Sequence, residues 1–271
     1  MLFMVLLKLT LAPVLIGLVS LAERRWGAAI SGALVGLPLT SGPVLFFVAV
    51  EQGASFSAHM AIGSLLGLTA LAAFALAYSL VARARGWLLS MGLAILAYVA
   101  VSAVIIEVPL RRAVLSFAVT CAGLSAVLCA FPRTPPSTTG VKSVTGGELI
   151  WRMITAGLLV FLLTAVAPIL GPIASALITM SPVYISILTV FNHLKSGMRA
   201  ITVLKGALTG AFGGAVFFVI VAAALERLAI GVCFGMAALA AVAVQAVLVP
   251  YLRLVPARDR PARRNHDLPY R

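Results

Sequence analysis

Two proline-containing breaks in apolar segments hold the residues whose types and spacing best suit ligand binding. The first is GLPLTSGP, residues 36–43, and the second is TMSPVYIS, residues 179–186. A proline inside a helix removes one backbone hydrogen bond and clashes with the preceding turn. The carbonyls freed in this way need other partners, and the neighbouring hydroxyl groups are the nearest polar side chains.

Both breaks lie about ten residues into an apolar stretch, which is ~15 Å along a helix and near the centre of a bilayer. Unwound backbone at that depth is tolerated where it is buried in protein or lines a cavity. The sequence therefore predicts two discontinuous helices that bind a small solute, with packing kinks as the alternative. The candidate residues are Pro38, Thr40, Ser41, Gly42, Thr179, Ser181, Pro182, Tyr184 and Ser186.

Three further residues could control access to such a site. Glu51 ends one apolar stretch and His59 begins the next, so a desolvated pair could respond to protons, whereas an interfacial pair would be solvated. Lys205 lies inside a later stretch, where it could face a cavity as a counter-charge for an anion or extend its stem to the surface. The sequence has no metal-ligand spacing, phosphate-binding glycine loop or hydrolase motif, so we expect no metal, no cofactor and no enzymatic activity.

The composition requires elements that cross a membrane. Of the 271 residues, 62% are hydrophobic and 10% are charged, and the mean hydropathy is +1.15. A soluble domain would be about 25% charged, which excludes a water-soluble enzyme. We predict an all-α integral membrane protein of about nine transmembrane helices. The apolar stretches are 2–21, 27–50, 58–82, 86–107, 112–131, 150–170, 171–193, 200–225 and 228–251.

The net charge of +13 indicates orientation before it indicates partners. With nine spans, most Lys and Arg residues fall on one side, which predicts an inner (plasma) membrane protein with its N-terminus outside and its C-terminus cytoplasmic. We expect four regions: a first transmembrane repeat with an extra span (1–131), a flexible linker (132–149), a second repeat (150–252) and a basic tail (253–271). The expected partners are the bilayer, anionic lipid at the tail and a small solute. A homodimer is left open, and nucleic acid is not expected.

An internal repeat appears at an offset of 144 residues, the separation of Pro38 from Pro182. Matched Gly and Pro residues matter more than matched aliphatic ones, because each imposes a backbone constraint. Five spans precede the second copy, so the copies are predicted to be four-helix repeats of inverted topology. Small residues at four-residue spacing, Gly63/Gly67 and Gly206/Gly210, predict close helix packing in the third and eighth spans. Other coincident pairs are Gly27/Gly171, Ser31/Ser175, Phe47/Phe191 and Gly53/Gly197.

The two copies resemble the GlpM-like family of small bacterial inner-membrane proteins. The first copy reads GLPLTSGPVLFFVAVEQG, and the second reads MSPVYISILTVFNHLKSG, with Lys195 where the family pattern has an acid. The resemblance implies two four-span units fused through an extra span. It also implies a bacterial inner-membrane location and a connection with envelope polysaccharide production.

Two functions follow as hypotheses. The first is a secondary transporter that moves a small solute by alternating access, because inverted repeats place a binding site near the membrane midplane. The alternative is a non-catalytic inner-membrane component that supports envelope polysaccharide or lipid biosynthesis. A transporter needs a polar cavity that reaches Pro38 and Pro182, whereas a supporting component could bury both.

Overall fold

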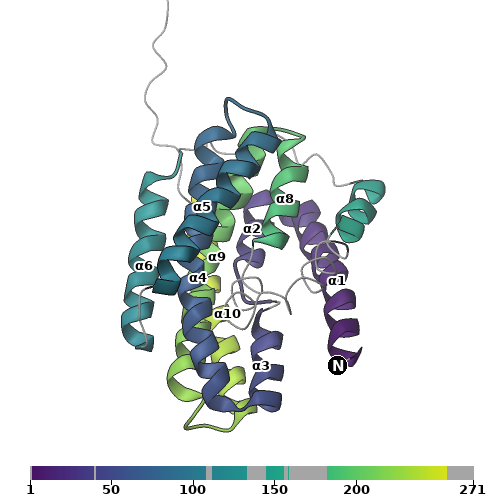
Figure 1. Ribbon diagram of the computed structural model, residues 1–271. Helices are drawn as coiled ribbons and strands as arrows, with labels where there is room; N and C mark the ends of the chain where they lie inside the picture. The colour runs from purple at the N-terminus through teal and green to yellow at the C-terminus, as the bar shows by residue number, and fades with distance from the viewer. Residues whose placement is uncertain are drawn as a thin grey trace, which may run out of the picture.

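A computed structural model describes residues 2–39, 41–107, 112–132, 145–155, 158 and 182–254, and every regular element in these ranges is an α-helix. The helices form one elongated bundle (Figure 1). A further short helix covers residues 146–155. The named helices are α1 (Leu2–Trp26), α2 (Ala28–Val35), α3 (Ser41–Gln52), α4 (Ala54–Val81), α5 (Trp87–Glu107), α6 (Ala113–Ala130), α8 (Val183–His193), α9 (Gly197–Ala224) and α10 (Ile230–Leu254).

Five of the described helices are long and apolar enough to cross a membrane: α4, α5, α6, α9 and α10. The outer helices α5 and α6 leave large apolar side chains such as Leu96 and Val114 exposed, which suits contact with lipid. The prediction of an all-helical membrane-embedded protein is confirmed at this level.

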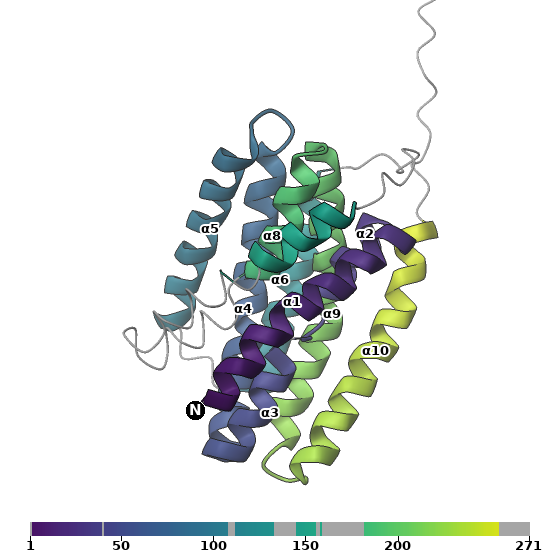
Figure 2. The same ribbon diagram turned by 90° about the vertical axis from the view of Figure 1, so that its right-hand side faces the viewer.

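The helices α4 and α9 form the centre of the bundle. Both contain 28 residues, and they run in opposite directions (Figures 1 and 2). Gly197 begins α9 next to the carbonyl of Ala82, which caps the end of α4. The other helices pack around this pair: α2, α6, α8 and α10 contact α9, and α3, α5 and α6 contact α4.

The second apolar stretch forms two short helices instead of one long one. Gly27, at φ 90°, separates α1 from α2. After Val35 the backbone turns, with the Leu39 amide donating to the Leu37 carbonyl at 2.8 Å, and helix resumes at Ser41. The interruption is the one that Pro38 predicts, because a proline cannot continue the preceding helix.

Side-chain hydrogen bonds connect helices that are distant in sequence. The Ser57 hydroxyl donates to the Leu45 carbonyl at 2.9 Å and joins α4 to α3. The Thr120 hydroxyl donates to the Leu65 carbonyl at 2.9 Å and joins α6 to α4. Such bonds between membrane helices contribute about 0.6 kcal/mol on average.

The predicted linker is shorter than expected at its second end. Helix begins at residue 146, so the last residues of the predicted 132–149 linker belong to it. The Glu148 amide donates to the Thr145 hydroxyl at 3.4 Å, and the Glu148 carboxylate pairs with Arg152 one turn later, which stabilises helix here. Residues 133–144 of the predicted linker and the tail beyond Leu254 lie outside the described residues.

Candidate functional site

The first break is packed directly against α9. A Cβ atom on Gly32 or Gly36 would overlap backbone atoms of α9, at Val203 and at Ala207 respectively. In return, Gly206 and Gly210 of α9 have no room for a Cβ atom against the backbone of α2. The Gly206/Gly210 packing prediction is therefore confirmed.

The other predicted packing pair lies on α4, the second central helix. Gly67 is buried, whereas a Cβ atom on Gly63 would meet nothing within 4 Å in the part of the chain that the structure describes. Spacing alone does not separate these two glycines, because a glycine becomes a contact only where a second helix approaches that face.

The polar groups of the first break lie at the start of α3. Ser41 is buried and begins the helix, and the Gly42 amide donates to the Pro38 carbonyl at 2.8 Å. Gly42 also lies against the ring of Phe217 on α9. Thr40, the remaining candidate here, lies outside the described residues.

The second break shares one backbone hydrogen bond with the first, although helix resumes directly after Pro182 and three residues after Pro38. Pro182 is the residue before α8, and its carbonyl accepts the amide of Ser186 at 2.8 Å. Tyr184 and Ser186 are half-buried in the first turns of α8. Thr179 and Ser181 lie outside the described residues. The helix α2, which ends before the first break, contacts α9 and also α8, which begins directly after Pro182.

The structure does not bring the three predicted access residues to the breaks. Glu51 and His59 are exposed, and His59 Nδ1 lies 2.8 Å from the carbonyl of Ser55 on its own helix. Lys205 is half-buried on α9. At 100° per residue it lies about 140° around the helix from Gly210, which contacts α2. Its face therefore differs from the one that receives the first break.

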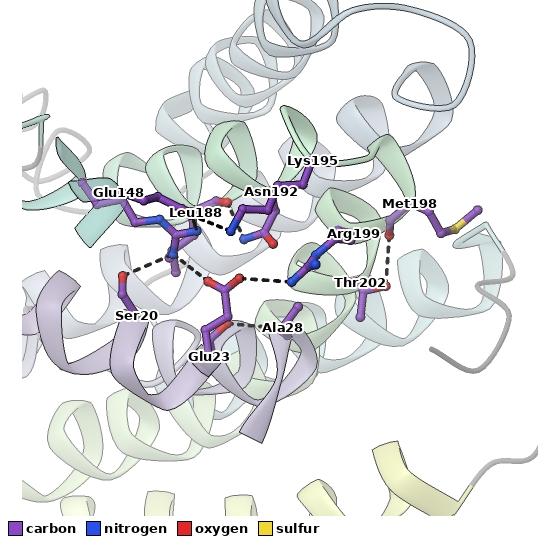
Figure 3. Close-up of polar contacts among 12 residues, drawn as sticks. Ser20, Glu23, Ala28, Glu148, Leu188, Asn192, Lys195, Met198, Arg199 and Thr202 are labelled. Carbon is purple, nitrogen blue, oxygen red and sulfur yellow. Dashed lines mark hydrogen bonds and ion pairs between the residues drawn. The ribbon is translucent and has the colours of Figure 1, made fainter. Parts of the chain in front are cut away.

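The structure reveals a group of charged and polar side chains, centred on the buried Arg152 and Glu23, that the sequence did not predict. We call it the Arg152 cluster: Ser20, Glu23, Glu148, Arg152, Lys195 and Arg199. Arg152 has an exposed fraction of 0% and Glu23 of 1%, and Arg152 Nη1 lies 2.6 Å from Glu23 Oε2. Figure 3 shows Glu23 and Ser20 on α1 facing Glu148, Lys195 and Arg199.

Further contacts complete the cluster. Arg152 Nη2 lies 2.6 Å from Glu148 Oε1, and Arg152 Nη1 donates to the Ser20 hydroxyl at 3.2 Å. Lys195 Nζ lies 2.7 Å from Glu148 Oε2, and Arg199 Nη2 lies 4.0 Å from Glu23 Oε1. Three basic groups and two carboxylates thus meet with one excess positive charge. The Arg152 guanidinium also lies 5.3 Å from the centre of the Phe191 ring, a cation–π distance.

Part of this cluster left a signal in the sequence. Glu148 and Arg152 are four residues apart, the spacing at which opposite charges meet on a helix. The pairing with Glu23 left no signal, because 129 residues separate Glu23 from Arg152. Glu23 could be interpreted only as the polar end of the first apolar stretch.

These helices and their buried polar contacts place the chain in the class of helical membrane proteins. No known protein family, curated protein or solved structure matches it.

Proposed function

We propose that this protein is a secondary transporter built from two four-helix repeats of inverted topology, with its solute site at the two proline breaks. The observation that carries the proposal is a backbone hydrogen bond at equivalent positions of the two breaks. The Pro38 carbonyl accepts the amide of Gly42, and the Pro182 carbonyl accepts the amide of Ser186, each at 2.8 Å. Donors and acceptors are both related by the same 144-residue offset.

The elements that follow the breaks support the proposed repeat. Each break leads into a short helix, α3 or α8, then into a 28-residue helix, α4 or α9, and then into α5 or α10. The connection between α4 and α5, residues 82–86, has the same length as the connection between α9 and α10, residues 225–229. The opposite directions of α4 and α9 support the proposed inverted arrangement, which is typical of secondary transporters.

The proposal counts nine spans: α1, α2 with α3, α4, α5, α6, the segment that begins at residue 146, the segment that ends in α8, α9 and α10. The charged residues support the proposed orientation in an inner membrane. At one end, which we call the basic end, the α4–α5 connection contributes Arg83 and Arg85, and the start of α9 contributes Lys195 and Arg199. An excess of Lys and Arg is typical of the cytoplasmic side.

The proposed site takes its polar groups from the starts of α3 and α8. Half-helices that begin near the midplane direct free amides and the positive end of the helix dipole toward a solute. Ser41, Tyr184 and Ser186 would add hydroxyl groups. We expect the driving force to be a gradient of the solute or of an ion, because no nucleotide-binding motif is present in the sequence.

Cysteine accessibility tests the proposal. Single replacements Thr40→Cys, Ser41→Cys, Ser181→Cys and Ser186→Cys are made after Cys121, Cys129 and Cys233 have been replaced by serine. We expect a membrane-impermeant maleimide to label them, because a transport site must admit water to the bilayer centre from one side at a time. Labelling is measured from each face of oriented membrane vesicles.

Thr120→Cys is the matched control. Thr120 is a buried hydroxyl residue near the middle of α6, which lies outside both proposed repeats, and it should not be labelled. If none of the four break positions reacts in correctly folded protein, the breaks are packing kinks. The supporting role in envelope polysaccharide or lipid biosynthesis would then be the better hypothesis.

A further inference from the structure

The Arg152 cluster joins the two halves of the chain at the basic end. Glu23 lies in α1 of the first half, and both of its cationic partners, Arg152 and Arg199, lie in the second half. Ser20 of α1 also accepts a hydrogen bond from Arg152. Every other ion pair of the cluster, Glu148 with Arg152 and Glu148 with Lys195, lies within the second half.

The helix α1 is well placed to control access to the first break. It packs against α2 and leads into it through Gly27. Figure 2 shows α1 crossing the bundle obliquely on the side where α2 and α3 lie. If α1 moved away from the second half at the basic end, it would uncover the helix that carries the break.

We propose that the contact of Glu23 with Arg152 and Arg199 is an ionic gate that holds the basic end closed. This inference rests on the proposed transport function and assigns two positioning residues, Glu23 and Arg152, to its access cycle. The structure then represents the conformation closed at the basic end. The contact stabilises only the closed conformation. Breaking it therefore shifts the population toward the conformation open at that end.

The opposite end of the bundle differs in the residues that the structure describes. Under the 144-residue offset, Lys195 corresponds to Glu51 and Arg199 corresponds to Ser55. Glu51 is exposed. No ion pair joins the two halves at that end among the residues that the structure describes. Within the described part of the chain, the ionic contact between the two halves is thus a feature of the basic end.

The test compares two carboxylates that both pair with Arg152 at 2.6 Å, Glu23 with a side chain 1% exposed and Glu148 with one 13% exposed. Glu23→Gln neutralises a carboxylate whose ion pairs join the two halves. Glu148→Gln neutralises a carboxylate whose ion pairs lie within the second half. Each is combined with Ser41→Cys at the break, and separately with Ile16→Cys, a fully buried position on α1 one turn before Ser20. An impermeant maleimide is added from the basic side.

We expect Glu23→Gln to raise the labelling rate of both reporter cysteines about tenfold and Glu148→Gln to leave both at the rate of the parent protein. Equal effects of the two variants, or no effect of Glu23→Gln, would overturn the gate. Size-exclusion elution and thermal unfolding in detergent show whether each variant is folded. A rise at Ile16→Cys without a rise at Ser41→Cys would also overturn the gate, because the ionic contact would then hold α1 against the second half without controlling access to the break. Failure of the gate with Ser41→Cys still labelled from the opposite side would leave the transport proposal intact.

Discussion

Replacing Arg152 with methionine is expected to lower the free energy of unfolding by about 3–5 kcal/mol, the typical cost of removing one partner of a buried ion pair. Arg152 is fully buried between the carboxylates of Glu23 and Glu148. Without the guanidinium, the buried carboxylate of Glu23 and the half-buried carboxylate of Glu148 lose their shortest contacts, although methionine fills much of the same volume. Denaturant unfolding in detergent micelles, followed by tryptophan fluorescence, measures the change.

Two variants show whether charge causes the loss. Arg24→Met alters an exposed arginine beside Glu23 in α1 and should leave unfolding unchanged. The double variant Arg152→Met and Glu23→Gln also neutralises the buried carboxylate that has lost its shortest contact, and it keeps the pair of Glu148 with Lys195. It should recover much of the lost stability, because neutral replacement of a buried ion pair is often tolerated. A double variant no more stable than Arg152→Met alone would contradict this account.

Replacing Gly32 with alanine is expected to destabilise the protein by about 1–3 kcal/mol, the usual cost of overpacking. The added methyl group would overlap the backbone carbonyl of Val203, and backbone atoms cannot rotate away as a flexible side chain can. The helices α2 and α9 would have to separate. Unfolding in detergent again gives the measurement.

Gly92→Ala on α5 is the matched control. A Cβ atom there meets nothing within 4 Å, and alanine has a higher helix propensity than glycine by about 1 kcal/mol, so Gly92→Ala should be neutral or stabilising. Equal losses at Gly32 and Gly92 would show that the contact with α9 does not determine the effect.

The sequence was sufficient to predict the local features of the fold. Apolar stretches predicted the helices, and Pro38 predicted where α2 and α3 separate, because both signals depend on neighbouring residues. The Gly206/Gly210 spacing was interpreted correctly as close packing. Its partners Gly32 and Gly36 were not identified, because the sequence does not show which helix packs against which.

The candidate site was less accessible to sequence reasoning. The hydroxyl groups of the breaks were found from their positions beside prolines. The Arg152 cluster was missed because Glu23, Arg152 and Lys195 come from three separate segments, and only the folded bundle brings them together. Lys205 attracted attention as a charge within an apolar stretch, yet its face of α9 is not the one that contacts α2.

The close contact of α2 with α9 has a consequence for how the chain reaches its native state. Backbone-to-backbone contact at Gly32, Gly36, Gly206 and Gly210 pairs a helix from the first half with one from the second. Neither half can complete its own packing alone, since α2 finds its close-fitting surface about 170 residues later in the chain. During synthesis, α2 would therefore enter the bilayer long before α9 is made. Until then its glycine-containing face would contact lipid instead of α9. The first half is thus expected to be the portion of the nascent protein most dependent on insertion factors.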